Sequence, residues 1–293
     1  MLDSPRHLLP SFNEGIQQES SLVNLPESAS GRPILDIVLA VAREAGAIAR
    51  DRFYTTKEVS LKRDASLVTD VDVQSERYVR DALAVEFPKV GFLGEELGLS
   101  GSPDGIRWIV DPLDGTRNYV AGLPHFAVSL ALADGPDVLL GVTYDPMRDE
   151  MFHAVKGQGA YLNSEPILVT RRTSVAECLL GLDIGGINRR SLSALKLVES
   201  LWPNMQSVRV MGSATLGLAY AASGRLDIFF HQAMAPWDVA TGMLLVRESG
   251  GALVDRLGGG PATLQSTGAV ASSPSLLEEF LRLTRGQEWY SVE

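Results

Sequence analysis

The sequence is poor in the features that mark secreted and membrane proteins. Its 293 residues include one cysteine, Cys178, which excludes an internal disulfide and is typical of a reducing compartment. Uninterrupted apolar runs are short, such as residues 37–42 and 130–133, whereas a membrane span needs roughly 18 residues. The N-terminus lacks a basic start followed by an apolar region, so no secretory signal is predicted. We therefore expect a cytoplasmic protein with no membrane partner.

Positive charge is scarce as well. The chain has 26 lysines and arginines against 36 acidic residues, which gives a net charge of −10. This balance argues against a general nucleic-acid or anionic-membrane surface. It does not exclude phosphorylated substrates, because bound cations can invert the local field. An anion-binding site on this chain is therefore expected to need a metal ion.

Motifs of several enzyme classes are missing. The four histidines and the cysteine show no clustered metal-ligand spacing, which argues against a zinc enzyme. Ser129 and Ser213 lack the small-residue elbow of a serine hydrolase. The run Gly258-Gly259-Gly260 does not open a helix, so it is neither a P-loop nor a dinucleotide fingerprint. His125 is expected to pack or to lie at the surface.

The periodicity of apolar residues predicts a mixed α/β protein. Residues 1–32 are rich in polar residues and proline and are predicted to be a disordered N-terminal tail. Residues 33–165 are expected to form an α+β half with an antiparallel meander, and residues 166–293 an α/β half with alternating elements. Helices are predicted at about 34–54, 72–87, 189–202, 213–222, 237–248 and 274–285, and strands at about 58–62, 90–93, 108–110, 126–132, 137–144, 150–155, 179–182, 207–210, 226–230, 252–254 and 268–271.

One short run places two carboxylates where a buried strand ends. Residues 108–110 are apolar, Pro112 is expected to stop the strand pairing, and Asp114-Gly115 marks a turn. Asp111 and Asp114 should therefore converge on a small volume, where two like charges are costly unless a cation lies between them. Oxygen ligands favour Mg²⁺ or Mn²⁺. Taken alone, the run is more typical of an ordinary polar turn after a strand.

Three further acidic positions stand at the ends of predicted elements. Glu95 follows a strand, as Asp111 does. Asp72 lies at the start of one helix and Asp238 at the start of another, where a role as helix cap is the alternative. With Asp111 and Asp114, these residues give five carboxylates at turns, which together favour a metal site.

Four separated motifs resemble those of the inositol monophosphatase family. They are Leu67-Val68-Thr69-Asp70-Val71-Asp72, Gly94-Glu95-Glu96, Asp111-Pro112-Leu113-Asp114-Gly115-Thr116 and Pro236-Trp237-Asp238. The resemblance runs from about Leu35 to the last predicted helix. It implies one domain of the sugar-phosphatase fold, an α/β (α+β) sandwich with alternating helix and sheet layers, and a homodimer. It also implies a Mg²⁺-dependent phosphomonoesterase acting on a small polyol or sugar phosphate, with inositol monophosphate as the first candidate.

The resemblance further implies metal ligands. It assigns a first cation to Glu95, Asp111 and the backbone carbonyl of Leu113, and a second to Asp111, Asp114 and Asp238. A third cation would rest on Glu95, with Asp72 acting through water. Two to three Mg²⁺ ions are therefore expected, with Mn²⁺ as an alternative. Two neighbouring cations can clamp the attacking and leaving oxygens of an in-line displacement.

Catalytic and substrate contacts are implied in the same way. Thr116 and Asp72 resemble the pair that orients and deprotonates the attacking water, beside Glu95, and no covalent phosphoenzyme is expected. The backbone N–H groups of Gly115 and Thr116 are candidates for the phosphate oxygens. The turn Gly212-Ser213-Ala214 resembles the substrate-contacting turn of the family.

One position departs from the inositol-specific pattern. His231 stands seven residues before Asp238, where inositol phosphatases usually carry a glutamate that contacts substrate hydroxyls. This difference affects recognition of the alcohol and leaves the metal ligands intact. Hydrolysis of fructose 1,6-bisphosphate, histidinol phosphate or 3′-phosphoadenosine 5′-phosphate therefore remains an alternative, as does a non-catalytic regulatory relative.

Overall fold

The computed structural model describes residues 23–62, 66–101, 105–186, 188–257 and 259–292. Most of the predicted tail lies outside the described residues. Residues 23–32 run as coil and turn beside the end of a helix, where the Ala29 N–H donates to the Glu86 carbonyl at 2.8 Å. The disorder predicted for residues 1–32 stays a prediction.

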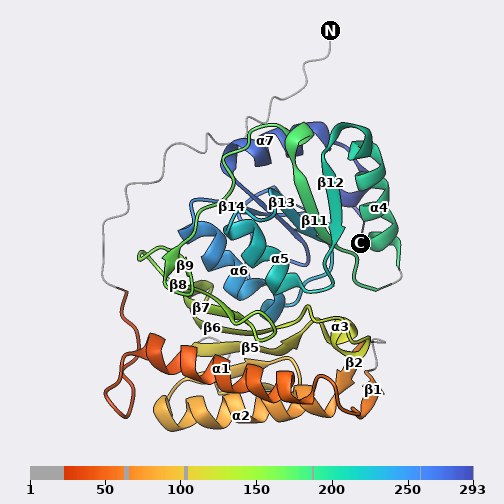
Figure 1. Ribbon diagram of the computed structural model, residues 1–293. Helices are drawn as coiled ribbons and strands as arrows, with labels where there is room; N and C mark the ends of the chain where they lie inside the picture. The colour runs from red at the N-terminus through yellow and green to blue at the C-terminus, as the bar shows by residue number, and fades with distance from the viewer. Residues whose placement is uncertain (1–22, 63–65, 102–104, 187, 258, 293) are drawn as a thin grey trace.

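Two helices form the first layer, α1 (Ile34–Arg52) and α2 (Asp70–Glu86). Val38, Ala42 and Val79 are among the fully buried residues that pack them against a large sheet (Figure 1). Helix α2 begins two residues before its predicted start because Thr69 forms a capping box: its hydroxyl accepts from the Asp72 N–H, and the Asp72 carboxylate accepts from the Thr69 N–H. A short hairpin, β1 (Val59–Leu61) and β2 (Leu67–Thr69), leads into this helix.

The large sheet has eight strands in the order β10-β9-β8-β7-β6-β5-β3-β4. Strands β5 to β10 form the predicted antiparallel meander, whereas β3 pairs with β5 in parallel. The strands are β3 (Gly91–Gly94), β4 (Gly98–Ser100), β5 (Ile106–Asp114), β6 (Ala127–Asp134), β7 (Asp137–Asp145), β8 (Glu150–Val155), β9 (Ala160–Leu162) and β10 (Glu165–Pro166).

Strand β5 corrects one prediction, because Pro112 does not end it. Pairing with β6 runs to Asp111↔Ser129, shifts register, and resumes at Asp114↔Ala127. Proline has no N–H to donate to the ladder, and a bulge is where a sheet tolerates it. Asp111 and Asp114 therefore flank an irregularity inside the strand, and the bulge re-aims their side chains.

The second sheet has five strands in the order β12-β11-β13-β15-β14. Strand β11 runs parallel to both of its neighbours, and β15 is antiparallel to β13 and β14. The strands are β11 (Leu179–Asp183), β12 (Ser207–Val210), β13 (Ile228–His231), β14 (Ala252–Asp255) and β15 (Ala269–Ser272). Helices α4 (Arg189–Leu201) and α7 (Pro274–Leu283) cover its outer face.

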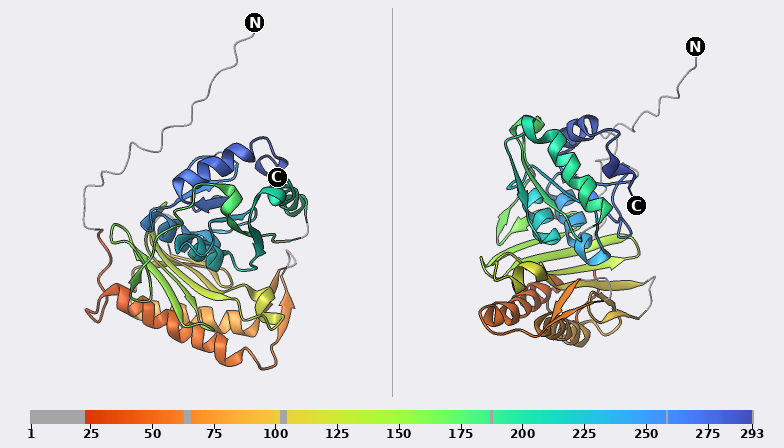
Figure 2. Two further views of the ribbon diagram at one scale, coloured as in Figure 1. Left: turned by 45° about the horizontal axis from the view of Figure 1, so that its top comes forward. Right: turned by 90° about the vertical axis from the view of Figure 1, so that its right-hand side faces the viewer.

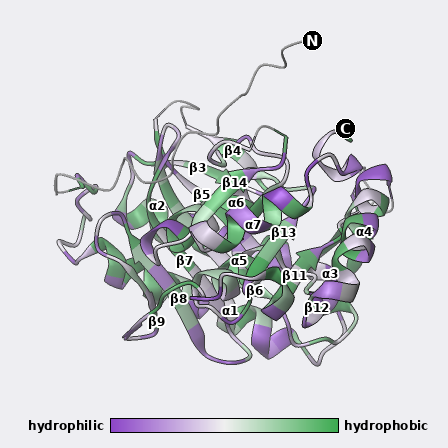
Figure 3. Ribbon diagram, turned by 90° about the horizontal axis from the view of Figure 1, so that it is seen from above, coloured by the Kyte–Doolittle hydropathy of each residue, from purple (hydrophilic) through white to green (hydrophobic). Residues whose placement is uncertain are grey.

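Helices α5 (Ala214–Ala222) and α6 (Pro236–Glu248) lie between the two sheets (Figures 1 and 2). Hydrophobic residues gather along β5 and β13 in the middle of the molecule (Figure 3). The order is thus helix, sheet, helix, sheet, helix, which confirms the predicted layered α/β sandwich. Short helical pieces complete the chain: α3 (Thr116–Val120) and the 3₁₀ turns η1 (Val175–Glu177), η2 (Trp202–Asn204) and η3 (Glu288–Tyr290).

The eight-stranded sheet ends at Pro166, and the next strand, β11, belongs to the other sheet. The proposed division into halves at residues 165 and 166 stays a prediction. Within the described part of the chain, no helix has both the length and the apolarity to cross a membrane.

Gly141 marks a very close approach between α6 and the large sheet. A Cβ atom at this residue would lie 3.2 Å from the Cα atom of Thr241 in α6, so a larger side chain must displace helix backbone. We expect Gly141→Val to lower the free energy of unfolding by about 1–3 kcal/mol, the range for overpacked cores. Urea denaturation measures this. Gly260→Val is the control, because a Cβ there meets nothing within 4 Å; equal losses in both variants would contradict the packing account.

Candidate active site

Three carboxylates converge where α6 begins beside β5. Oxygen atoms of Asp111, Asp114 and Asp238 all lie within 4.8 Å of one another. Asp111 and Asp114 are buried and Asp238 is partly buried. The bulge in β5 supplies the first two, and the first turn of α6 supplies the third. The predicted ligands of the second cation are therefore neighbours in space.

All three residues of this cluster are acidic, so none of them balances the negative charge of the others. Burial, followed by repulsion from Glu95, Asp114 and Asp238, raises the pKa of Asp111 well above its usual value. Burial and repulsion from Asp114 do the same to the pKa of Asp238. A cation relieves such repulsion, and a set of carboxylate oxygens suits a hard divalent ion. The residues present thus fit a divalent metal ion.

Backbone and side-chain donors hold each carboxylate in place. Asp111 accepts from the Leu113 N–H at 3.0 Å, and Asp238 accepts from the Ala235 N–H at 2.7 Å. Asp114 accepts from the Ser213 hydroxyl at 2.6 Å and from the N–H and hydroxyl of Thr215 at 2.8 and 2.6 Å. Asp114 therefore joins the large sheet to the start of α5. These bonds fix the carboxylates before any ligand arrives.

Glu95 lies beside the cluster but has a cationic partner of its own. The Lys62 ammonium is 2.7 Å from Glu95 and 2.6 Å from Glu96. Burial raises the pKa of Glu95 although Lys62 lowers it, and Asp72 and Asp114 raise it further. The structure thus brings Glu95 into the electrostatic field of the other carboxylates, with Lys62 bound where a further cation was predicted. None of the sequence motifs indicated this pairing.

Thr116 and Asp72 meet as predicted. The Thr116 hydroxyl is 3.1 Å from Asp72 Oδ1 and 3.0 Å from the Leu113 carbonyl. The other oxygen of Asp72 accepts from the N–H and the hydroxyl of Thr69. Asp72 therefore caps the helix with one oxygen and contacts Thr116 with the other. The cap is confirmed, and a role of Asp72 beside a metal ion stays a prediction.

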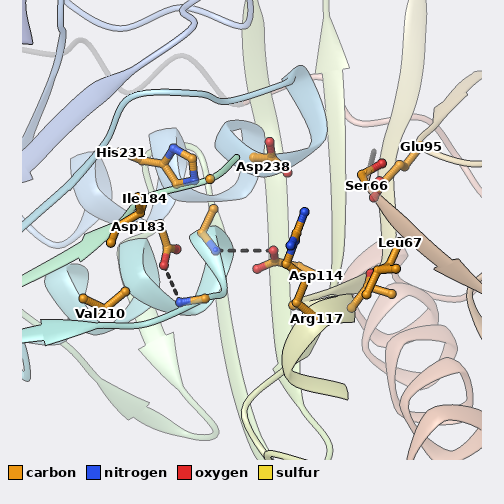
Figure 4. A pocket seen from close by; sticks show the side chains of 15 residues that line it. Ser66, Leu67, Glu95, Asp114, Arg117, Asp183, Ile184, Val210, His231 and Asp238 are labelled. Atoms are coloured by element: carbon orange, nitrogen blue, oxygen red, sulfur yellow. Dashed lines mark hydrogen bonds between the residues drawn. The ribbon is translucent and has the colours of Figure 1, made fainter. Parts of the chain in front are cut away.

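A cavity of about 280 Å³ opens beside the carboxylates (Figure 4). Its walls include most of the predicted site residues: Glu95, Asp114, Gly115, Thr116, Gly212, Ala214, His231 and Asp238. Ser213 lies between two of them, but its hydroxyl is bound to Asp114 and its oxygen also caps α5. Gly115 has φ +94°, and a Cβ atom there would lie 3.0 Å from the His125 carbonyl. Only glycine suits this backbone conformation and this space.

The structure also shows site residues that the sequence reasoning missed. Asp183 ends β11 and lines the cavity with Ile184 and Gly185. Asn118 in α3 ties the turn at Gly212 down through hydrogen bonds to the carbonyls of Met211 and Gly212, at 3.0 and 3.1 Å. The rule that singled out Asp111 and Glu95, a carboxylate following a buried strand, applies equally to Asp183. No comparable signal marks Asn118.

Comparisons with known proteins agree with this geometry. The model of the inositol monophosphatase family matches residues 31–288. Inositol monophosphatase 1 of Solanum lycopersicum is 35% identical over 274 residues, covering 91% of this chain and 100% of the relative. Nus factor SuhB of Xylella fastidiosa is 39% identical over 227 residues, covering 76% and 82%. The structure of extragenic suppressor protein SuhB from Bartonella henselae superposes with a TM-score of 0.82 at 32% identity, covering 86% and 98%.

The carboxylates predict a pH-dependent effect of metal on stability. Burial raises the pKa of Asp183 from 3.8 to about 8, and the pKa values of Asp111 and Asp238 also rise. Carboxyls with raised pKa values stabilise the fold below their unfolded pKa, and that stability is lost as pH rises through the folded pKa. The metal-free protein should therefore lose stability between about pH 4 and pH 8.

A divalent cation should oppose this loss. We expect Mg²⁺ to raise the melting temperature more at about pH 8 than at about pH 5, because protons compete with the metal at low pH. Thermal unfolding with Mg²⁺ and with a chelator, across this range, measures the difference. Asp238→Asn, which removes one charge, should shrink both effects. A shift by Mg²⁺ that is larger at low pH would contradict the metal assignment.

Proposed function

The chain belongs to the inositol monophosphatase family, and from this membership we propose that its metal is Mg²⁺ and that the five acidic residues at turns form its active site. The protein is a phosphoric monoester hydrolase of the inositol monophosphatase type. The convergence of Asp111, Asp114 and Asp238 is the observation that carries the assignment of the site.

We assign the metal ligands as follows. Asp111, Asp114 and Asp238 would hold one Mg²⁺, and Glu95, Asp111 and the Leu113 carbonyl would hold another, with a third on Glu95. Bound there, the divalent ions would lower the pKa of water and offset the charge of the phosphoryl group. The lysine that now pairs with Glu95 can move aside, because its ammonium ends a flexible chain of four carbons.

Thr116 orients the attacking water, and Asp72 accepts its proton. The Thr116 hydroxyl donates to Asp72 or to the Leu113 carbonyl, so its free lone pair can accept a hydrogen bond from water at the cavity wall. Burial raises the pKa of Asp72, which makes its carboxylate a stronger base for the proton of that water. The water oxygen would then bond to phosphorus as the bond from phosphorus to the ester oxygen breaks, and the departing alkoxide would take up a proton from solvent water to become the alcohol.

The phosphate and alcohol occupy different walls of the cavity. Gly115 and Thr116 present backbone to the phosphate, and the missing side chain of Gly115 permits close approach. Gly212, Ser213, Ala214 and His231 are assigned to the alcohol side. Inositol monophosphate is the first candidate substrate, supported by the name of the tomato relative, inositol monophosphatase 1. Other polyol and sugar phosphates are the next candidate substrates. The presence of all five carboxylates disfavours a non-catalytic role.

Asp238→Asn tests the site. The amide keeps the shape of the side chain but removes a charge that the cation needs. We expect Mg²⁺-dependent release of phosphate from inositol 1-phosphate to fall by about a thousandfold or more, an effect of the size seen when a key charge stabiliser is removed. Circular dichroism should show an unchanged fold. Asp137→Asn, an exposed aspartate at the start of β7, is the matched control. Full turnover in Asp238→Asn would sink the assignment.

His231→Glu tests the alcohol side. Burial lowers the pKa of His231 to about 4, so the imidazole is neutral at pH 7 and offers a hydrogen-bond donor where the inositol-specific pattern has a carboxylate. We expect the substitution to change KM across a panel of inositol, sugar, histidinol and nucleotide phosphates far more than kcat for the best substrate. A uniform loss of kcat on every ester would remove His231 from the alcohol subsite.

We propose a homodimer in the cytoplasm that acts on a small phosphorylated substrate without nucleic-acid or membrane partners. Light scattering of the purified protein tests the dimer.

A further inference from the structure

Two polar residues lie at the ends of adjacent strands and line one wall of the cavity. Asp183 closes β11 and His231 closes β13, and the two residues are paired in register across these parallel strands. The carboxyl ends of parallel strands form one edge of a sheet, where open α/β sheets bind ligands. Figure 4 shows Asp183 and His231 on one side of the cavity, with Asp114, Arg117 and Glu95 toward the other.

Asp183 has an unsatisfied oxygen in this wall. The residue is 3% exposed, and one carboxylate oxygen accepts from the Gly212 N–H. Its other oxygen, Oδ2, has no hydrogen-bond partner among the described residues. Buried polar atoms are nearly always paired, and an exception calls for an explanation such as a functional role or a bound group. Oδ2 is itself buried, but Asp183 lines the cavity, so a rotation of its carboxylate would let a bound ligand supply the missing partner.

His231 offers the complementary group. Its Nδ1 atom accepts from the Ala233 N–H at 2.9 Å, so the neutral ring carries its proton on Nε2. Burial holds the pKa of this ring at about 4, which keeps it neutral near pH 7. This wall thus combines the unpaired Oδ2 atom of Asp183 with the ring N–H donor of His231 on the neighbouring strand.

We propose that Asp183 is a specificity-determining residue that binds a hydroxyl group of the substrate's alcohol through Oδ2, beside a second hydroxyl bound by His231. The proposal rests on the proposed phosphatase function and narrows its substrate class to esters of polyols and sugars with neighbouring hydroxyls. Nothing in the sequence motifs assigned a role to Asp183.

A hydroxyl is the group that fits Asp183 best. The oxygen needs a donor when the carboxyl is ionised and an acceptor when it is protonated, and a hydroxyl can serve as either. Burial brings the pKa of Asp183 to about 8, so both forms occur near neutral pH. An ester without hydroxyls would leave Oδ2 unpaired, and sites built to bind a hydroxyl strongly reject analogues that lack it.

A purely structural role is the competing explanation. The Asp183 carboxylate accepts a hydrogen bond from the Gly212 N–H, and the Gly212 carbonyl accepts one from the Asn118 amide. Loss of Asp183 could therefore shift the turn before α5 and, through Ser213 and Asp114, disturb the metal ligands. Such a shift would lower activity on every phosphate ester alike. Selectivity between esters separates the two explanations.

The test compares inositol 1-phosphate with cyclohexyl phosphate, which has the same ring size without the hydroxyls. We expect Asp183→Ala to lower the ratio of kcat/KM for these two esters at least tenfold, mainly through the KM for inositol 1-phosphate. Asp183→Asn keeps an acceptor for the Gly212 N–H, so it should lower the ratio less. This variant also carries the test if Asp183→Ala does not fold.

Asp227→Asn is the matched control, because Asp227 is a buried aspartate just before β13 in the same sheet, where it pairs with Arg172. We expect this variant to keep the wild-type ratio even if its melting temperature falls. An unchanged ratio in both Asp183 variants, or an equal loss on both esters, overturns the role of Asp183 and leaves the phosphatase function standing. A wild-type protein that hydrolyses neither ester with Mg²⁺ overturns both.

Discussion

Repulsion among buried carboxylates is the constraint on which the rest of the site depends. Asp111, Asp114 and Asp238 place oxygens within 4.8 Å of one another, and each raises the cost of charge on a neighbour. Such a cluster is stable only if the fold forces the residues together and either protons or a cation neutralise their charges. The first condition is met by rigid elements: a bulge in a central strand and the first turn of a helix packed between two sheets.

The same residues join the layers of the fold. Asp114 leaves the large sheet and accepts three short hydrogen bonds from Ser213 and Thr215 at the start of α5. Asp238 begins α6, whose Thr241 bonds with Thr143 on the large sheet at 3.0 Å. A cation held by Asp114 and Asp238 would therefore brace the sheet against the middle helices. Because ligands that bind only the folded state stabilise it, metal binding should stabilise the packing of the large sheet against α5 and α6.

The sequence allowed the helices, the strands and the clustered carboxylates to be predicted because they leave local signals, whereas the order of the layers was implied by the resemblance to the family. Apolar periodicity marked the helices, and carboxylates at element ends marked Glu95, Asp111 and Asp238. Pro112 was misjudged because a missing N–H indicates that strand pairing is interrupted but not whether it resumes, and Ala127 on β6 provides the later partner. The pairing of Lys62 with Glu95 depends on tertiary contact across 33 residues, which no local pattern reports.

The proposed alcohol side of the cavity would allow recognition to move between strands without altering the chemistry. In the inositol-specific pattern a glutamate stands where this chain has His231, a neutral donor at the end of β13. Its neighbour in register, Asp183, carries a carboxyl at the same edge of the sheet. Parallel strands deliver paired residues to one edge, so an acceptor lost from β13 can be supplied by β11 with the metal ligands untouched. In this proposal the cluster of carboxylates sets the reaction and the pair of strand ends sets the alcohol, which would explain why the motifs that reveal the family say so little about its substrate.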